Sequence, residues 1–217
     1  MRGAIFDMDG ILFDTERIYQ ETWREVAAEM GVMTLPYEFT LAVSGAAKDA
    51  VFRAIRKYYH TDDPEKVADE VYSRMERKQE RPLPIKPGVT EILKAFQKGG
   101  AGIAVASSTY HEQVRKNLER NGLLPYFDAV ISGDEVKRTK PDPEIFLKAA
   151  GKIGMPPEEC YVFEDSFNGI RAAHAAGCCA VMVVDLMEPD EEIRSIADHV
   201  FHSMTEAQEK LDFFKEF

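Results

Sequence analysis

The chain has 217 residues, of which 45% are apolar and 30% charged, a composition typical of a globular protein with a sizeable core. Its net charge of −11 argues against non-specific binding to nucleic acid or to anionic membranes. The apolar runs are too short to span a bilayer, and Met1 leads directly into an apolar strand pattern, so we expect neither a membrane segment nor a signal peptide. The three cysteines lack the spacing of a disulfide framework, which favours reduced thiols and a cytoplasmic location.

The first predicted elements are one strand and a helical stretch. Gly3–Phe6 is a short apolar strand pattern. From Glu16 onward apolar residues recur at four-residue spacing until Gly31, which predicts a helix that ends there. Two further helices and a proline-rich linker are predicted at Lys48–Tyr59, Pro64–Gln79 and Arg81–Gly88.

Strands and helices alternate in the rest of the chain. The predicted helices are Val89–Lys98, His111–Arg120, Pro143–Ile153, Phe167–Ala176 and a closing helix near Thr205–Phe214. The predicted strands are Gly102–Ser107, Asp128–Ser132, Tyr161–Glu164, Ala180–Asp185 and a weaker one at His199–His202. This alternation predicts the α/β fold class, with a Rossmann-like parallel sheet and helices on both of its faces.

The segment between the first two strands is unusually long. A parallel crossover needs only about a dozen residues, whereas roughly ninety separate these strands and they have a helical pattern throughout. We interpret most of this segment as a small helical cap domain inserted after the first strand. The predicted domains are therefore a cap of residues 16–81 and an α/β catalytic core of residues 1–15 and 82–217.

Polar residues gather where the predicted strands end, and ligands of open α/β sheets bind at that edge. These residues are Asp7 and Asp9, then Ser107, Ser108 and Thr109, then Lys140, then Glu164 and Asp165. Taken singly, each has an ordinary explanation, such as a helix cap, a solvated lysine or an acidic helix start. Taken together, four acids at one edge would repel one another unless a cation and a phosphate occupy the site.

The same residues carry a family resemblance. The segments FDMDG at Phe6–Gly10, KPDPEIF beginning at Lys140 and FEDSFNGIRAA around Glu164–Asp165, with Ser107 ending an apolar strand, resemble the four motifs of the haloacid dehalogenase-like (HAD) hydrolases in order and spacing. A cap inserted after the first motif is similar to the β-phosphoglucomutase-like subgroup, which contains sugar-phosphate phosphatases and mutases.

The resemblance implies a phosphoryl-transfer site that works with Mg²⁺. It makes Asp7 the nucleophile that forms an aspartyl phosphate, and the Asp9 side chain the general acid and base. The implied metal ligands are the Asp7 carboxylate, the Asp9 main-chain carbonyl, Glu164 and Asp165. The implied contacts of the phosphoryl group are Ser107 and Lys140, with Ser108 and Thr109 as further candidates.

The cap departs from the mutase pattern. Tyr19 stands where the mutases have a histidine, and Ser44 precedes Gly45 where they have a lysine. Lys48 falls near the position of their substrate-contacting arginine, although a lysine lacks the bidentate fork. We therefore favour hydrolysis of a small phosphate monoester, a sugar or polyol phosphate, over β-phosphoglucomutase-like transfer.

Two alternatives come from other functional classes. A receiver-type signalling module also has an acidic pocket with a phosphorylated aspartate, but it is shorter and carries that aspartate in mid-chain. A non-catalytic binding relative should lack one of the acids, and none is missing. The expected partner is a phosphorylated small molecule, without nucleic acid or membrane. The sequence determines neither the substrate nor the oligomeric state, for which a monomer is our expectation.

Overall fold

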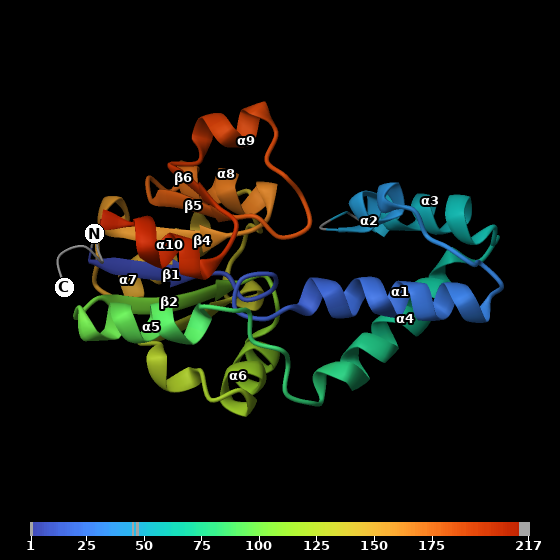
Figure 1. The fold of residues 1–217 in the computed structure, drawn as a ribbon, viewed down its shortest axis with the longest axis horizontal. Helices are drawn as coiled ribbons and strands as arrows, with labels where there is room; N and C mark the ends of the chain where they lie inside the picture. Colours follow the sequence, from blue (N-terminus) through green and yellow to red (C-terminus); the bar gives the residue numbers. More distant parts are fainter. Residues whose placement is uncertain (1, 45, 47, 213–217) are drawn as a thin grey trace. The chain divides into compact units, whose positions relative to one another are not determined.

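Two units make up the protein, and the computed structural model describes residues 2–44, 46 and 48–212. The sheet unit consists of Met1–Asp14 and Leu83–Phe217, and the helical unit consists of Thr15–Pro82 (Figure 1). No helix in the described part of the chain combines the length and the apolar character that crossing a bilayer requires.

The sheet unit is built on six parallel strands. They are β1 Gly3–Phe6, β2 Gly102–Ser107, β3 Ala129–Ser132, β4 Cys160–Glu164, β5 Cys179–Val183 and β6 His199–Phe201. Their order across the sheet is β3-β2-β1-β4-β5-β6, and every neighbouring pair is parallel. The chain leaves β1 toward β2 and later returns to its other side with β4, so the strand order reverses at β1, where such sheets bind ligands. The predicted α/β parallel sheet is confirmed.

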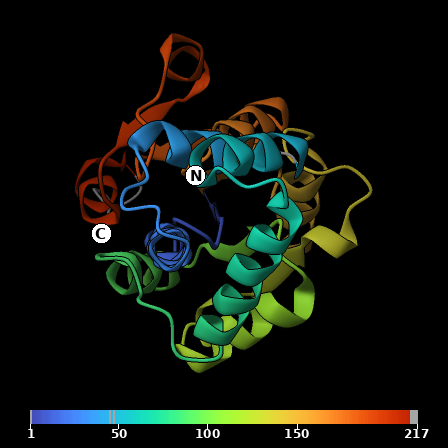
Figure 2. The same cartoon turned by 90° about the vertical axis from the view of Figure 1, so that its right-hand side faces the viewer.

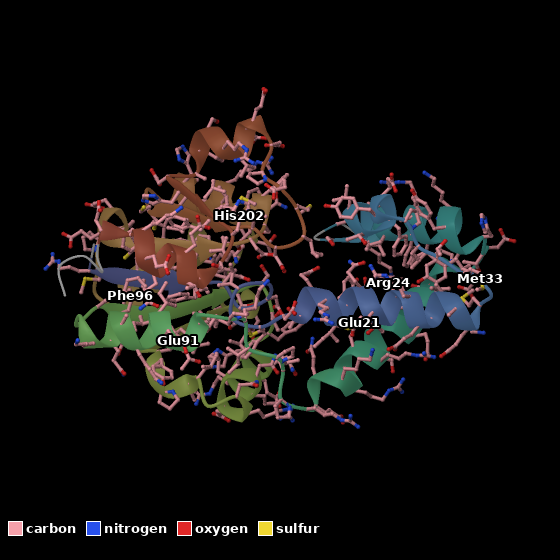
Figure 3. The ribbon with its side chains drawn as sticks, in the orientation of Figure 1. Glu21, Arg24, Met33, Glu91, Phe96 and His202 are labelled. Atoms are coloured by element: carbon pink, nitrogen blue, oxygen red, sulfur yellow. The ribbon has the colours of Figure 1, made fainter. Side chains whose placement is uncertain are left out.

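Helices cover both faces of the sheet. Successive β1 side chains point to opposite faces, so Ile5 and Phe6 contact different helices. The helices of this unit are α5 Val89–Lys98, α6 His111–Arg120, α7 Glu144–Lys152, α8 Phe167–Ala175, α9 Glu191–Ile196 and α10 Met204–Lys210. Ile5 packs with buried residues of α7 and α8. Phe6 stacks on Phe163 with ring centroids 4.6 Å apart and meets Phe96 of α5 edge-on at 6.0 Å. Phe96 is labelled in Figure 3.

The helical unit contains α1 Thr15–Glu29, α2 Tyr37–Val43, α3 Lys48–Tyr59 and α4 Pro64–Gln79. Figure 2 looks almost along α1, with α2 and α3 above it and α4 to its right. Trp23 of α1 is fully buried, and its ring meets those of Phe39 and Tyr59. The Tyr59 hydroxyl donates a hydrogen bond of 2.6 Å to the Trp23 carbonyl, so this unit has an aromatic core of its own.

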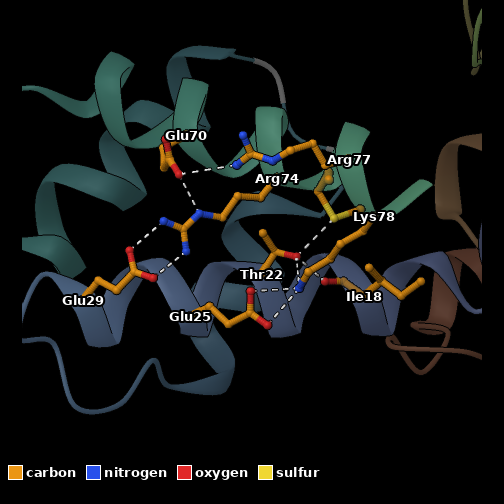
Figure 4. A network of polar contacts seen from close by, with 9 residues as sticks. Ile18, Thr22, Glu25, Glu29, Glu70, Arg74, Arg77 and Lys78 are labelled. Carbon is orange, nitrogen blue, oxygen red and sulfur yellow. Dashed lines mark hydrogen bonds and ion pairs between the residues drawn. The ribbon is translucent and has the colours of Figure 1, made fainter. Parts of the chain in front are cut away.

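A polar network joins α1 to α4 (Figure 4). The Arg74 guanidinium donates to both carboxylate oxygens of Glu29 and also to Glu70, each at 2.6 Å. Lys78 donates to Glu25 at 2.9 Å and to the Thr22 hydroxyl at 3.0 Å. Bidentate pairing fixes the geometry of the arginine more tightly than a single contact does. These bonds set the register of α1 against α4.

The predicted elements agree with the structure to within two residues at most boundaries. Helix α2 was not predicted, because its seven residues are too few to establish a helical period. The closing helix ends at Lys210, and the predicted end at Phe214 lies outside the described residues.

Candidate active site

The site lies where β1, β2 and β4 end, and Asp7 is at its centre. Asp7 directly follows β1, and its main-chain N–H donates to the Phe163 carbonyl of β4 at 3.0 Å. Continued alternation places the Asp7 side chain on the same face as Ile5, the face that α7 covers. The loop before α7 carries Lys140, so the fold brings this lysine to the first-motif acid.

Lys140 is held by three oxygen atoms. Its Nζ lies 2.5 Å from Asp7 Oδ1 and 2.7 Å from Glu164 Oε1, and it donates to the Ala106 carbonyl at 3.2 Å. Only 7% of its side chain is exposed, and the ammonium lies 5.0 Å from the centroid of the Phe146 ring. An ammonium group has three donors, so these contacts fix its position.

Glu164 holds Lys140 through one oxygen and the start of α8 through the other. Its side chain is 1% exposed, and Oε2 accepts from the Ser166 N–H and hydroxyl at 2.8 and 2.9 Å. Ser166 also caps α8 by accepting from the Gly169 N–H at 3.0 Å. A Cβ on Gly169 would lie 1.9 Å from the Glu164 carboxyl, so only glycine fits there.

No role at the site was predicted for Ser166 or Gly169. A usable signal was present, because glycine is a poor helix former and one stands in the first turn of α8 after a serine cap. Such a glycine indicates a close approach by another group.

At the centre of the site, and within the part of the chain that the structure describes, Asp7 and Glu164 share the ammonium of Lys140. Burial raises the pKa of Asp7 from 3.8 to about 7, and Glu164 and Asp9 reinforce this shift while Lys140 opposes it. Burial alone would lower the pKa of Lys140, but Asp7 and Glu164 outweigh burial and raise it. The lysine therefore stays charged, while the negative charge of Asp7 is only partly compensated.

The end of β2 is tied to Asp9. The Thr109 hydroxyl donates to Asp9 Oδ2 at 3.1 Å, and the Thr109 N–H donates to the Ser107 hydroxyl at 3.1 Å. Ser107 is 1% exposed, whereas Ser108 is exposed. The structure thus places three of the predicted hydroxyls at the edge that carries the acids.

Asp165 lies against the turn that follows Asp9. Gly10 has φ of +77°, and a Cβ on it would lie 2.3 Å from Asp165 Oδ2. Both the positive φ and the contact require glycine at this position. Asp165 is therefore beside the first-motif turn.

Lys48 is a residue of the helical unit. It is exposed, and its Nζ pairs with Glu65 Oε1 at 2.9 Å and lies 5.0 Å from the centroid of the Phe52 ring. The hydrogen bond that Lys48 donates to Glu65 raises the pKa of Lys48. The predicted substrate contact of Lys48 stays a prediction, and Gly45 lies outside the described residues.

Comparison with known proteins places these motifs in a family. The model of the haloacid dehalogenase-like hydrolases matches residues 4–183. The chain belongs to this family. It is 36% identical over 180 residues to the phosphorylated carbohydrates phosphatase of Thermotoga maritima, covering 82% of each chain. It is also 36% identical over 185 residues to the fructose-1-phosphate phosphatase YqaB of Escherichia coli, covering 83% of this chain and 95% of that one.

A solved structure agrees with the assignment. The HAD family hydrolase of Deinococcus radiodurans, crystallised with bound phosphate and sodium, aligns with a TM-score of 0.83 at 26% identity, covering 96% of this chain and 93% of that one. The family and the fold that the motifs predict are confirmed.

Membership of the HAD hydrolases implies a divalent metal. Within residues 2–44, 46 and 48–212, no three His, Cys, Asp or Glu side chains form a ready metal site, and Lys140 lies between Asp7 and Glu164. The chemistry of the donors nevertheless fits a hard cation. Asp7 carries incompletely compensated charge, and Asp165 contributes carboxylate oxygens beside the same turn. Lys140 contacts one oxygen of Glu164 and Ser166 the other. The predicted role of Glu164 as a metal ligand stays a prediction.

Proposed function

We propose that the protein is a Mg²⁺-dependent phosphatase that releases inorganic phosphate from a small phosphorylated sugar or polyol. The observation that carries this proposal is the buried Asp7 carboxylate paired with the buried Lys140 ammonium at the carboxyl edge of the sheet. A phosphate ester is a dianion that repels an anionic nucleophile, so its attack requires cationic groups at the reacting atoms. The printed names of the two phosphatases described above support this class of substrate.

In the first step, an Asp7 oxygen attacks phosphorus, and the bond from phosphorus to the leaving oxygen breaks. Asp9 gives its proton to that oxygen, so the product leaves as an alcohol and Asp7 carries the phosphoryl group. Lys140 offsets the charge that builds on the phosphoryl oxygens, and Ser107 and Thr109 provide hydroxyl donors at the same edge.

In the second step, water attacks phosphorus and the bond to Asp7 breaks. Asp9, now a carboxylate, takes the proton of the water, which restores both acids and releases inorganic phosphate. A divalent metal, which Asp7, Asp165 and the Asp9 carbonyl would hold, supplies charge neutralisation for the phosphate when bound. Glu164 keeps Lys140 in place throughout.

We propose that the sheet unit is the catalytic core and the helical unit a cap, and that the protein is a cytoplasmic monomer.

The residue at position 19 favours hydrolysis over phosphohexomutase transfer. The Tyr19 ring contacts the Trp23 ring edge-on and stacks with that of Tyr72, and burial raises the pKa of its phenol. A neutral, half-buried phenol is a poor proton shuttle near neutral pH, unlike the histidine of the mutase pattern.

A phosphate-release assay over phosphorylated sugars and polyols tests the proposal. With Mg²⁺ present, we expect release from at least one member, abolished by EDTA and restored by added Mg²⁺. With β-glucose 1-phosphate and a trace of the 1,6-bisphosphate, phosphate should form faster than glucose 6-phosphate, if this sugar is accepted. Rapid isomerisation with little phosphate would establish the mutase instead. Full activity after EDTA treatment and dialysis would exclude the mechanism.

A further inference from the structure

The two segments that connect the sheet unit to the helical unit pair with each other inside the sheet unit. Phe13 and Ile85 form an antiparallel bridge. The Asp14 N–H donates to the Pro84 carbonyl at 2.9 Å, and the Lys86 N–H donates to the Leu12 carbonyl at 3.0 Å. We call residues 12–14 and 84–86 the connecting ladder.

The connecting ladder is continuous with the turn that carries Asp9. Phe13 forms a second bridge with Asp9, and the Gly10 N–H donates to the Phe13 carbonyl at 3.0 Å. The Leu12 N–H donates back to the Met8 carbonyl at 2.9 Å. A displacement of the ladder therefore moves the backbone on both sides of Asp9.

One ion pair fastens the ladder to the sheet. Lys86 Nζ lies 2.5 Å from Asp185 Oδ1, just beyond the end of β5, with side-chain exposures of 19% and 14%. The second oxygen, Asp185 Oδ2, is buried and has no hydrogen-bond partner among the described residues. A carboxylate that is largely removed from water depends on its ion-pair partner for compensation. Lys86 therefore provides the main compensation for the negative charge of Asp185.

We infer that Lys86 is a positioning residue, whose ion pair with Asp185 holds the connecting ladder and thereby sets the position of the Asp9 carboxyl. The inference rests on the proposed function, because it concerns the proton that Asp9 gives to the leaving oxygen. A small displacement of a catalytic group lowers the rate sharply. The ion pair lies outside the set of groups proposed to touch the phosphoryl group, so its loss should affect proton transfer selectively.

This selectivity can be measured with two leaving groups. A sugar or polyol leaves as an alkoxide that must be protonated, whereas p-nitrophenolate leaves readily without a proton. Asp9 also acts as the base of the second step, which both esters share, so the comparison uses the first step, the release of the leaving group in a single turnover. Loss of the ion pair should lower this single-turnover rate for the sugar phosphate and leave it almost unchanged for p-nitrophenyl phosphate. A general loss of structure would lower both.

The variants are Lys86→Met and the double variant Lys86→Met/Asp185→Asn. The single variant strands a largely buried carboxylate and risks unfolding, whereas the double variant removes both charges and avoids that cost. The matched control is Arg2→Met, because Arg2 forms an ion pair of the same length, 2.5 Å, with Glu159 at the opposite end of the strands. Amide hydrogen exchange at Asp14 and Lys86 reports on the ladder directly, since both N–H groups donate across it.

In the double variant we expect the single-turnover rate of leaving-group release from the sugar phosphate to fall about tenfold or more. The same rate for p-nitrophenyl phosphate should stay within about twofold of the parent, and exchange at the two amides should be faster. Arg2→Met should match the parent in all three. Equal losses on both substrates, or unchanged kinetics, or unchanged exchange would overturn the inference. If the parent protein released phosphate from neither ester, the proposed function would fail, while amide exchange would still test the ladder.

Discussion

Asp7 Oδ1 and Lys140 Nζ lie 2.5 Å apart although 133 positions separate the two residues in the chain. The strand order makes the meeting possible, because β1 is central and the loop before α7 reaches its carboxyl end. Glu164 takes a second N–H of the same ammonium at 2.7 Å. The lysine is thus shared between the proposed nucleophile and a carboxylate that holds it.

Removal of Lys140 should lower the rate of phosphoryl transfer, whereas it should have little effect on the fold of the helical unit. We expect Lys140→Met to lower kcat about 10²-fold or more, as loss of a group that stabilises transition-state charge does. Glu164→Gln keeps an acceptor but loses the charge that compensates Lys140, so a smaller loss of about tenfold is expected. The exposed Lys152→Met is the control. Steady-state phosphate release measures all three, and parent-like turnover of Lys140→Met would contradict its role.

The contact between Gly169 and Glu164 can be tested with a matched pair of glycines. An alanine at 169 would place its Cβ 1.9 Å from the Glu164 carboxyl, whereas a Cβ on Gly151 in α7 meets nothing within 4 Å. Alanine in an open helix position stabilises by up to about 1 kcal/mol. We expect Gly151→Ala to keep or raise Tm, and Gly169→Ala to lower both Tm and kcat. Equal Tm values for the two variants would show that Glu164 can move without cost.

Asp7 should destabilise the metal-free protein at high pH. Its pKa in the folded protein, about 7, exceeds the 3.8 of the free group, mainly because it is buried. The folded state therefore binds a proton more tightly than the unfolded state, and this contribution is complete below pH 3.8 and lost as the pH rises toward 7. In EDTA, Asp7→Asn should have a higher Tm than the parent at pH 8, and the difference should shrink toward pH 4. A difference that is constant with pH would contradict the shift.

Lys48 is predicted to contribute to substrate use without taking part in the chemistry. It pairs with Glu65 inside the helical unit, whereas Asp7 and Lys140 belong to the sheet unit. Lys48→Ala should raise KM for the sugar phosphate and spare hydrolysis of p-nitrophenyl phosphate. The control is Lys57→Ala on the same helix, another exposed lysine near an aromatic ring. An equal effect of Lys48→Ala on both substrates would remove Lys48 from the proposed substrate contacts.

Much of this arrangement was predictable from the sequence, because strand ends carry a local signal. Asp7 and Ser107 directly follow or end short apolar runs, so the parallel sheet predicts their edge without knowledge of strand order. Lys140 lies in the loop after the predicted strand Asp128–Ser132, which places it at the same edge, whereas its contact with the phosphoryl group was indicated only by the family resemblance.

Other features depend on contacts that no local pattern encodes. The pair of Lys86 and Asp185 joins segments 99 positions apart, and neither residue belongs to a motif. The engagement of both Glu164 oxygens by Lys140 and Ser166 likewise follows only from the packed structure. These contacts show how Glu164 holds Lys140 and the start of α8, which the sequence could not show.

The most direct test of the account is to trap the phosphoryl group on the protein. The Asp9→Asn variant should still be phosphorylated by an ester with a good leaving group, but it should hydrolyse the acyl phosphate at least about 10²-fold more slowly, because no base activates the water. Rapid quenching, reduction of the acyl phosphate with borohydride and peptide mass spectrometry should then find homoserine at position 7, and none in Asp7→Asn/Asp9→Asn. Reduction at another carboxyl group, or turnover of Asp7→Asn at the parent rate, would contradict the assignment of Asp7 as nucleophile.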